Sequence, residues 1–353
     1  MTENAVLEWN QERHPSFAPL AEWLLGPVRV AVLDAAITLG IADILAETDD
    51  PDVIATRLES HPGNTRLLLD ALTTLGLAEK KQGHYANTPL AECYLRRDSE
   101  TYLGGLIGNL MRMEHRNLPR LTELITSGPP PVARENRLDD EERWKRSARD
   151  LARYQKAGMA DLAADLVASL PESPKLRCLL DLGGGPGVIG LGILARHPNM
   201  RGALCDLPAV IEVAREEIAA AGMADRVALF PGDYNTISFG SGYDLVWASL
   251  NLYYAKDLRA FLGRVLDALN SGGIFISLHE GMTDERTKPE GYVLSRLSFA
   301  LEGQEVSFEA GQITEAALAA GFASGETRYC DTPMGEVQVD ILRKAGNLGE
   351  ATA

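Results

Sequence analysis

Positive charge is scarce in this chain. Lysine and arginine number 34 against 50 aspartate and glutamate residues, so the formal net charge at pH 7 is −16. Phosphate backbones are bound mainly through lysine and arginine, and a chain of this sign repels them. We therefore expect no general binding to nucleic acid.

Cysteine is also scarce, and the four cysteines lie far apart in the sequence, at Cys93, Cys178, Cys205 and Cys330. Their spacing matches neither a zinc site nor a disulfide framework, so we expect free thiols in a reducing compartment and no bound metal. No apolar run approaches the roughly 20 residues that span a membrane. The first residues lack a basic segment followed by an apolar one, so we expect no signal peptide, no membrane contact and a cytoplasmic protein.

Hydrophobic residues are abundant enough for a sizeable core. They make up 45% of the 353 residues, beside 24% charged residues, which is typical of a soluble globular protein of about two domains. Changes in composition along the chain predict a mostly α-helical N-terminal domain at 1–127. A linker with connecting helices follows at 128–170, and a second domain occupies 171–347.

The N-terminal part has the pattern of a winged helix. Apolar residues recur at helical spacing over 17–46, two short helices are predicted at 52–58 and 65–77, and a hairpin follows at 78–86. The predicted buried side of the second short helix consists of Leu67, Leu68, Ala71, Leu72 and Leu75. Winged helices often bind DNA, but this helix carries a single cation, Arg66, so we expect subunit contact instead.

A glycine-rich turn follows the first predicted strand of the second domain. The apolar run 176–182 leads into Gly183, Gly185 and Gly187, and a helix is predicted at 188–195. A strand, a glycine turn and a helix form the first unit of a doubly wound parallel sheet. The spacing of Gly185, Gly187 and Gly190 also fits the dinucleotide fingerprint, so an oxidoreductase with a nicotinamide cofactor is one alternative.

Acidic residues stand at the ends of the predicted strands. Asp181 precedes the glycine turn, where it would repel a phosphate but could receive an ammonium group. Asp206 ends the second strand and could accept from both hydroxyls of a ribose. Asp233 follows the third strand and could accept from the amino group of an adenine, with Tyr234 against the ring. Ribose, adenine, an α-amino group and no phosphate together describe S-adenosylmethionine, whereas a nicotinamide cofactor would leave two of these acids unused.

The same runs resemble a known family. LLDLGGGPG, CDLPAVIEVA and FPGDY are similar to the class I methyltransferases, and AVLDAAITLGIADIL, NTPLAECYL and LNSGGIFISLHE narrow the resemblance. The chain resembles the small-molecule O-methyltransferases with an N-terminal winged-helix dimerisation domain, which include plant caffeate-type enzymes and bacterial tailoring enzymes. This resemblance implies a Rossmann-like α/β sheet of seven strands, a homodimer, and S-adenosyl-L-methionine as methyl donor with S-adenosyl-L-homocysteine as product. It also implies cofactor contacts from Leu207 and from Ser249, where the family usually has a lysine.

The match is weaker where the family binds its methyl acceptor. The family usually has a histidine base after the fourth strand, and the corresponding position here is Tyr253. A tyrosine, with a pKa of about 10, is a poor general base at pH 7 unless it is perturbed. Three explanations stay open: the acceptor is already anionic or acidified, Tyr253 only orients it, or the acceptor is not a phenol. Bacteriochlorophyllide C-methyltransferases have a tyrosine in a similar run, so a tetrapyrrole-like or other carbon acceptor is an alternative, as is a family member that has lost ordinary O-methyl transfer.

The resemblance assigns further residues to the acceptor. Glu280 ends the fifth strand as a family glutamate does, and Glu305 falls where a family glutamate orients the base, so Glu305 joins Tyr253 as a catalytic prediction. His279 is predicted to point to the opposite face of its strand. The predicted substrate contacts are His115, Tyr154, Met159 and Tyr254.

The sequence therefore predicts a methyltransferase that uses S-adenosylmethionine. The acceptor is expected to be a small planar molecule, aromatic or hydroxylated, with oxygen favoured as the methylated atom. The expected partners are this acceptor and a second copy of the chain. A winged-helix transcription regulator would need a basic face, and a non-catalytic cofactor binder would never release S-adenosylhomocysteine.

Overall fold

The computed structural model describes residues 15–130 and 141–346. The expectation of no signal peptide concerns residues 1–14 and so lies outside the described residues. The chain divides into two compact units, Met1–Gly104 and Gly105–Ala353, and the predicted linker at 128–170 falls inside the second. Within the described residues, no helix is both long enough and apolar enough to cross a lipid bilayer.

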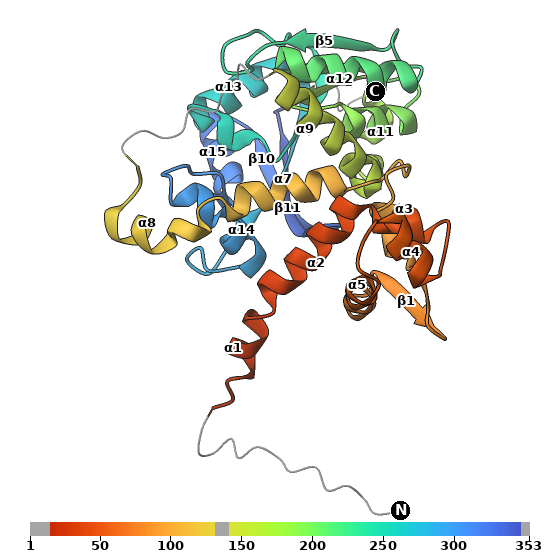
Figure 1. Ribbon diagram of the computed structural model, residues 1–353. Coiled ribbons are helices and arrows are strands. Elements are labelled where there is room, and N and C mark those ends of the chain that lie inside the picture. Colours follow the sequence, from red (N-terminus) through yellow and green to blue (C-terminus); the bar gives the residue numbers. More distant parts are fainter. Residues whose placement is uncertain (1–14, 131–140, 347–353) are drawn as a thin grey trace, which may run out of the picture. The chain divides into compact units, whose positions relative to one another are not determined.

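The first unit is mostly helical, with one small hairpin. Its elements are α1 (Ala18–Trp23), α2 (Gly26–Leu39), α3 (Ile41–Leu45), α4 (Pro51–Arg57), α5 (Pro62–Thr74), β1 (Ala78–Lys81), β2 (His84–Asn87) and α6 (Pro89–Tyr94) (Figure 1). The strands β1 and β2 pair antiparallel. The helices α3 to α5 and this hairpin enclose a small core that includes Ile41, Ile54, Leu69 and Tyr85. The predicted winged helix is confirmed.

One detail of that prediction is wrong. The side chain of Leu67 is 68% exposed, while Thr65, Leu69 and Leu72 are buried. Three consecutive leucines cannot all face the same side of a helix, because successive residues are about 100° apart. The periodicity of a leucine-rich run therefore did not identify which of its members faces the core.

The second unit contains the sheet and most of the helices. Its elements begin with α7 (Gly104–His115), η1 (Leu118–Arg120), α8 (Leu121–Ser127), α9 (Glu141–Tyr154), the π-helical turn η2 (Gln155–Met159), α10 (Ala160–Ala168), η3 (Ser173–Lys175), β3 (Cys178–Leu182), α11 (Val188–Arg196), β4 (Arg201–Asp206), α12 (Pro208–Ala220) and β5 (Val227–Pro231). They continue with β6 (Tyr243–Ser249), η4 (Leu252–Tyr254), α13 (Leu258–Ala268), β7 (Leu269–His279), β8 (Gly281–Met282), α14 (Glu290–Ala300), β9 (Phe308–Glu309), α15 (Gln312–Ala320), β10 (Ser324–Thr332) and β11 (Gly335–Arg343).

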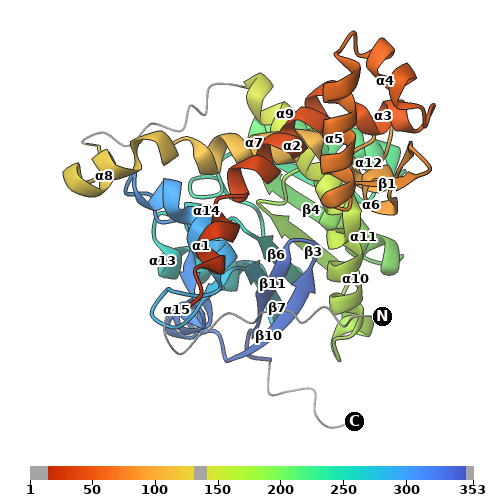
Figure 2. The same ribbon diagram turned by 60° about the horizontal axis from the view of Figure 1, so that its bottom comes forward.

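Seven strands form one sheet in the order β10-β11-β7-β6-β3-β4-β5, which confirms the predicted doubly wound α/β fold (Figure 2). The strands β3 to β7 run parallel, and β11 pairs antiparallel with both β7 and β10. The chain builds outward from β3 through β4 to β5 and then returns with β6 on the other side of β3. The strand order therefore reverses between β3 and β6, and in such sheets ligands bind beyond the carboxyl ends of the strands at that point.

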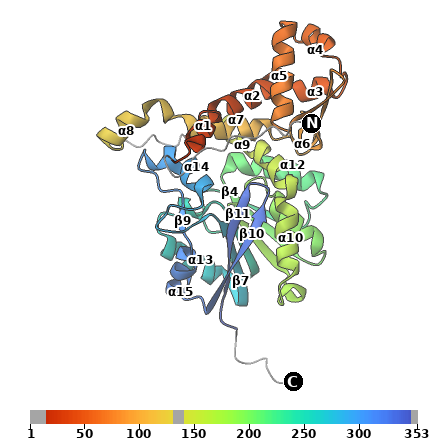
Figure 3. The ribbon, with the colours of Figure 1, turned by 90° about the horizontal axis from the view of Figure 1, so that it is seen from below.

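Helices cover both faces of this sheet. The helices α13 and α15 lie on one face, and α10, α11 and α12 lie on the other (Figure 3). Leu180 and Leu182 of β3 pack with Phe261 of α13 and Ile313 of α15 in the main core. Because side chains alternate along a strand, Asp181 faces α11 instead. Burial of these apolar side chains is the main favourable term in folding.

The connecting helices of the segment predicted at 128–170 are interrupted between α9 and α10. The α-helix ends at Tyr154, and Ala157 (φ −77°, ψ 23°) and Gly158 (φ +125°) break the helical backbone before α10 begins. Glycine adopts this positive φ without the clash that a Cβ would cause.

Candidate active site

The glycine turn joins β3 to α11 at the point where the strand order reverses. Gly183, Gly185 and Gly187 have φ values of +64°, +62° and +79°, in the left-handed region that other residues rarely adopt. A side chain at these positions would strain the backbone. The turn therefore requires these three glycines for its shape, whatever it binds.

Asp206, at the end of β4, is bonded to this turn. Its Oδ2 accepts a hydrogen bond from the Gly185 N–H at 2.8 Å, and its Oδ1 accepts one from the Leu207 N–H at 2.7 Å. Burial raises the pKa of this carboxyl, and the two N–H donors oppose that rise. The carboxylate thus joins the end of β4 to the glycine turn, where the sequence predicted a ribose contact for Asp206 and a cofactor contact for Leu207.

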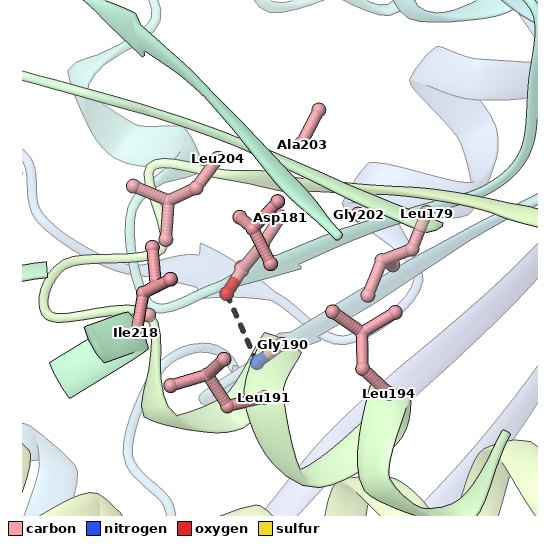
Figure 4. Close-up of a pocket in the computed structure, with 11 residues that line it drawn as sticks. Leu179, Asp181, Gly190, Leu191, Leu194, Gly202, Ala203, Leu204 and Ile218 are labelled. Carbon is pink, nitrogen blue, oxygen red and sulfur yellow. Dashed lines mark hydrogen bonds between the residues drawn. The ribbon is translucent and has the colours of Figure 1, made fainter. Parts of the chain in front are cut away.

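Asp181 lies beneath the turn, on the side of α11. Its Oδ2 accepts a hydrogen bond from the Gly190 N–H at 3.1 Å, and its side chain lines a small cavity with Leu179, Leu191 and Leu194 (Figure 4). Burial raises the pKa of Asp181 to about 7. The predicted contact of Asp181 with an ammonium group stays a prediction. The residue is only 2% exposed, and its carboxylate already accepts a hydrogen bond from the first turn of α11.

Two further glycines are required by the position of Asp181. A Cβ added at Gly184 would lie 2.4 Å from the carboxyl carbon of Asp181, and one added at Gly190 would lie 2.8 Å from its Oδ2. The Gly190 that completed the dinucleotide fingerprint in the sequence is therefore explained by packing against a carboxylate.

Asp233 and Tyr234 follow β5. The Oδ1 of Asp233 accepts hydrogen bonds from the backbone and side-chain N–H groups of Asn235, both at 2.8 Å, so Asp233 stabilises a tight turn. The Tyr234 hydroxyl donates to the Asn251 carbonyl at 2.7 Å, and its ring lies 4.8 Å from that of Phe261. Burial raises the pKa of this phenol. The predicted adenine contacts of both residues stay predictions.

Asn251 is a residue that the sequence analysis did not single out. Its Nδ2 donates to the carbonyls of Leu182 and Gly183, at 2.6 Å and 2.9 Å, so the loop after β6 is tied to the glycine turn after β3. Its Oδ1 is buried and has no hydrogen-bond partner among the described residues. No local pattern marks such a residue, although its place two positions beyond a parallel strand is a usable signal.

Replacing Asn251 by alanine is expected to lower the free energy of unfolding by about 1–2 kcal/mol, because two buried carbonyls lose their donor. Cofactor affinity should fall a few-fold as the turn loosens. Thermal unfolding and calorimetric titration with S-adenosylhomocysteine would measure the two effects. The matched control is Asn270→Ala, since Asn270 donates to the Gly242 carbonyl at the opposite edge of the sheet. Equal affinity losses in both variants would contradict the assignment of Asn251.

Tyr253 and Tyr254, on η4, lie beside a charged pair. The Arg296 guanidinium lies over the ring of Tyr253, 5.4 Å from its centre, and donates to Oε1 of Glu280. Burial and the neighbouring Tyr254 raise the pKa of Tyr253, so even less of the basic phenolate is present near neutral pH than for a free tyrosine. Tyr254 is 55% exposed, and its ring contacts that of Tyr253 edge-on, 4.7 Å between centres.

The other predicted site residues are scattered. Glu305 is mostly exposed and accepts hydrogen bonds from Arg286 and Ser307, so its placement gives no support to a role beside Tyr253. His115 is exposed on α7, and Met159 is 2% exposed and packs in the core. The remaining two are Tyr154, which is buried with its pKa raised, and Ser249, whose hydroxyl accepts from the Trp247 indole at 2.6 Å.

His279 lies in a buried polar group and shares a ring neighbour, Phe308, with Tyr253. It is 1% exposed, its Nε2 lies 3.7 Å from Oδ2 of Asp340, and its ring contacts that of Phe308 edge-on at 5.6 Å. Burial lowers its pKa. In the described segments, no group of three or more His, Cys, Asp or Glu side chains is placed to hold a metal ion.

Comparison with known proteins identifies both parts of the chain. Residues 21–97 match the model of an O-methyltransferase dimerisation domain, and residues 143–323 match that of an O-methyltransferase domain. The 3-hydroxy-5-methyl-1-naphthoate 3-O-methyltransferase of Streptomyces sahachiroi is 31% identical over 277 residues, which cover 76% of this chain and 79% of that protein. The N,N-dimethyltransferase OxyT of Streptomyces rimosus is 27% identical over 317 residues, or 86% and 90% of the two chains.

A solved structure shares the fold. The crystal structure of human N-acetylserotonin methyltransferase in complex with S-adenosylmethionine has a TM-score of 0.77 and 20% identity, and covers 98% of this chain and 100% of that one. The family is established by the domain model and the Streptomyces relative. This chain therefore belongs to the O-methyltransferase family and is a methyltransferase that uses S-adenosylmethionine.

Proposed function

We propose that this protein transfers the methyl group of S-adenosylmethionine to a hydroxyl oxygen of a small, planar aromatic molecule. The observation that carries the proposal is the glycine turn bonded to the carboxylate of Asp206 at the carboxyl edge of a doubly wound sheet. Support for the acceptor comes from the relative named for a hydroxynaphthoate, and from the aromatic side chains Tyr154, Tyr253 and Tyr254 near that edge.

The side chains around the turn fit a positively charged nucleoside. In this proposal Asp206 accepts from the ribose hydroxyls, Asp233 and Tyr234 receive the adenine, and the backbone of Gly183 to Gly187 holds the methionine end, supported from beneath by Asp181. When bound, S-adenosylmethionine supplies a methyl group on a sulfonium, whose sulfur is a good leaving group. The work left to the protein is to bring the acceptor to near-attack distance and to remove its proton.

The alternatives from the sequence are less favoured. A carbon acceptor of tetrapyrrole type, or the loss of ordinary methyl transfer, rested on Tyr253 in place of the usual base. The Streptomyces relative named as an O-methyltransferase and the domain match over 143–323 favour oxygen. Tyr253, as a neutral phenol, is suited to orient an acceptor by donating a hydrogen bond.

We also propose that the protein works as a homodimer. The first unit matches the family's dimerisation domain, and three large side chains of α1 and its end are exposed there: Leu20 (57%), Trp23 (69%) and Leu24 (77%). Exposed apolar clusters of this kind mark protein–protein contact surfaces.

The test is an assay of S-adenosylhomocysteine release. The protein is incubated with S-adenosylmethionine and a panel of hydroxylated naphthoates and anthraquinones, and the products are identified by mass spectrometry. We expect release that depends on the acceptor, with the added methyl group on oxygen. Tight binding of S-adenosylmethionine without release for any acceptor would overturn the catalytic proposal, and methylation at carbon would overturn the choice of oxygen.

A further inference from the structure

We infer that Glu280 is the group that takes the proton from the methyl acceptor, and that the acceptor presents an un-ionised hydroxyl to it. This inference rests on the proposed function and assigns to Glu280 the base role that Tyr253 cannot fill.

One oxygen of the Glu280 carboxylate has no partner. Oε1 accepts a hydrogen bond from Arg296, whereas Oε2 is buried and without a hydrogen-bond partner among residues 15–130 and 141–346. The whole residue is 6% exposed. A buried carboxylate oxygen is costly to leave unbonded, and buried polar atoms are almost always paired. The missing donor is therefore expected to come from a ligand.

Glu280 lies at the carboxyl edge of the sheet, the same edge as the glycine turn after β3. It follows β7, whose Leu278 pairs with Ser249 of β6, and β6 lies between β7 and β3 in the sheet. Two strand spacings, about 10 Å, thus separate the end of β7 from the glycine turn after β3. This is the span that a cofactor extending from the turn toward an acceptor would bridge.

The groups that face Glu280 hold it in place. Arg296 of α14 bonds one oxygen, and three phenols surround the pair: Tyr154 of α9, Tyr253 of η4 and Tyr292 of α14. Burial, and next the negative charge of Glu280, raises the pKa of Tyr292 to about 12. These phenols stay protonated near neutral pH, and a neutral phenol is a very weak base, so none of them competes for the acceptor's proton.

Other possible bases are excluded by their placement. His279 is 1% exposed, and its Nε2 lies 3.7 Å from Oδ2 of Asp340, so Asp340 is the group that this imidazole faces. Glu305 is mostly exposed and bonded to Arg286.

The proton transfer balances in atoms and charge. The O–H bond of the acceptor breaks and its proton moves to Oε2 of Glu280. An electron pair of the acceptor's hydroxyl oxygen forms the new bond to the methyl carbon. The electron pair of the C–S bond that breaks stays on the sulfur. The negative carboxylate and the positive sulfonium thereby neutralise each other. An already ionised acceptor would instead be repelled by Glu280.

The experiment compares Glu280→Gln with the wild-type protein on two acceptors that the wild type methylates. One is a hydroxynaphthoate, and the other is its nitro derivative, whose hydroxyl is ionised at the assay pH. Glutamine keeps an acceptor for Arg296 but cannot take a proton. We expect kcat to fall about 100-fold on the first acceptor, as for loss of a general base, and less than about tenfold on the second. Similar losses on both acceptors would overturn the inference.

Two matched variants separate this role from others. Glu302→Gln removes another buried glutamate, which is paired with Arg116, and should leave the ratio of the two rates unchanged. Glu305→Gln tests the rival glutamate. The inference would be overturned if kcat fell much more on the un-ionised acceptor than on the ionised one in Glu305→Gln and not in Glu280→Gln. Thermal unfolding and S-adenosylhomocysteine affinity, measured on each variant, would reveal a folding defect.

A binding measurement tests the inference without turnover. The phenolate of 4-nitrophenol absorbs visible light, so its binding can be followed directly with S-adenosylhomocysteine present. We expect Glu280→Gln to bind the phenolate at least about threefold more tightly than the wild type, because a like charge is removed. Equal affinity would overturn the placement of Glu280 beside the acceptor, whereas a wild type that binds the cofactor and methylates nothing would overturn only the proposed function.

Discussion

Replacing Asp206 by alanine is expected to weaken the binding of S-adenosylmethionine by about tenfold or more, or roughly 1.4 kcal/mol. The change removes the acceptor for two backbone donors, the N–H groups of Gly185 and Leu207. It also removes the carboxylate that we assign to the ribose hydroxyls. Calorimetric titration with S-adenosylmethionine and with S-adenosylhomocysteine would measure the loss.

A second aspartate of the same sheet provides the control. Asp244 accepts hydrogen bonds from the backbone N–H groups of Arg177 and Cys178, at 2.8 Å and 3.1 Å, but at the amino end of β3. Asp244→Ala should lower the midpoint of thermal unfolding and leave cofactor affinity near that of the wild type. Near-wild-type affinity in Asp206→Ala would remove the assignment of Asp206.

The part of the site that the sequence predicted well is the part formed by contiguous residues. The apolar strand, the three glycines at positive φ and the following helix lie within about twenty residues, and each leaves a local mark on the sequence. Asp206 was found in the same way, because it ends the next strand. The carboxyl ends of parallel strands meet at one edge, so residues marked at strand ends come together.

The part that was missed depends on pairing between distant segments. Asn251 acts by donating to carbonyls on a strand that lies almost seventy positions earlier, and a single asparagine carries no sign of this. Arg296 bonds Glu280 only because α14 packs back over the end of β7. The resemblance offered Glu280 and Glu305 together, but which of the two is buried is decided by tertiary packing.

The buried carboxylate of Asp181 leads to the last prediction. Its pKa is raised by burial to about 7 in the folded protein, against the ordinary aspartate pKa of 3.8. Between these two pH values the folded chain holds a proton that the unfolded chain releases. This group therefore stabilises the fold fully at low pH, and its contribution is lost as the pH rises through about 7.

Asp181→Asn should remove that dependence. Asparagine keeps an oxygen that can accept from the Gly190 N–H, but it cannot ionise. At about pH 8 the free energy of unfolding of Asp181→Asn should exceed that of the wild type by at most roughly 4 kcal/mol. Each unit by which the pKa of Asp181 is raised corresponds to about 1.4 kcal/mol. At about pH 4, where both proteins are uncharged at this position, the difference should largely vanish. Chemical denaturation across this range gives the comparison, and other titrating groups cancel between the two proteins.

The same variant decides what Asp181 does in the site. Its carboxylate faces α11 and the small cavity there, so we expect cofactor affinity to stay within about threefold of the wild type. A positioning residue of this kind acts by fixing the first turn of α11 under the glycine turn, and asparagine preserves that bond. If affinity instead fell more than about tenfold while stability was unchanged, Asp181 would be a direct partner of the ammonium group, as the sequence suggested. The two readouts therefore separate the two roles: a positioning role changes the stability at high pH and leaves the affinity, whereas an ammonium partner changes the affinity.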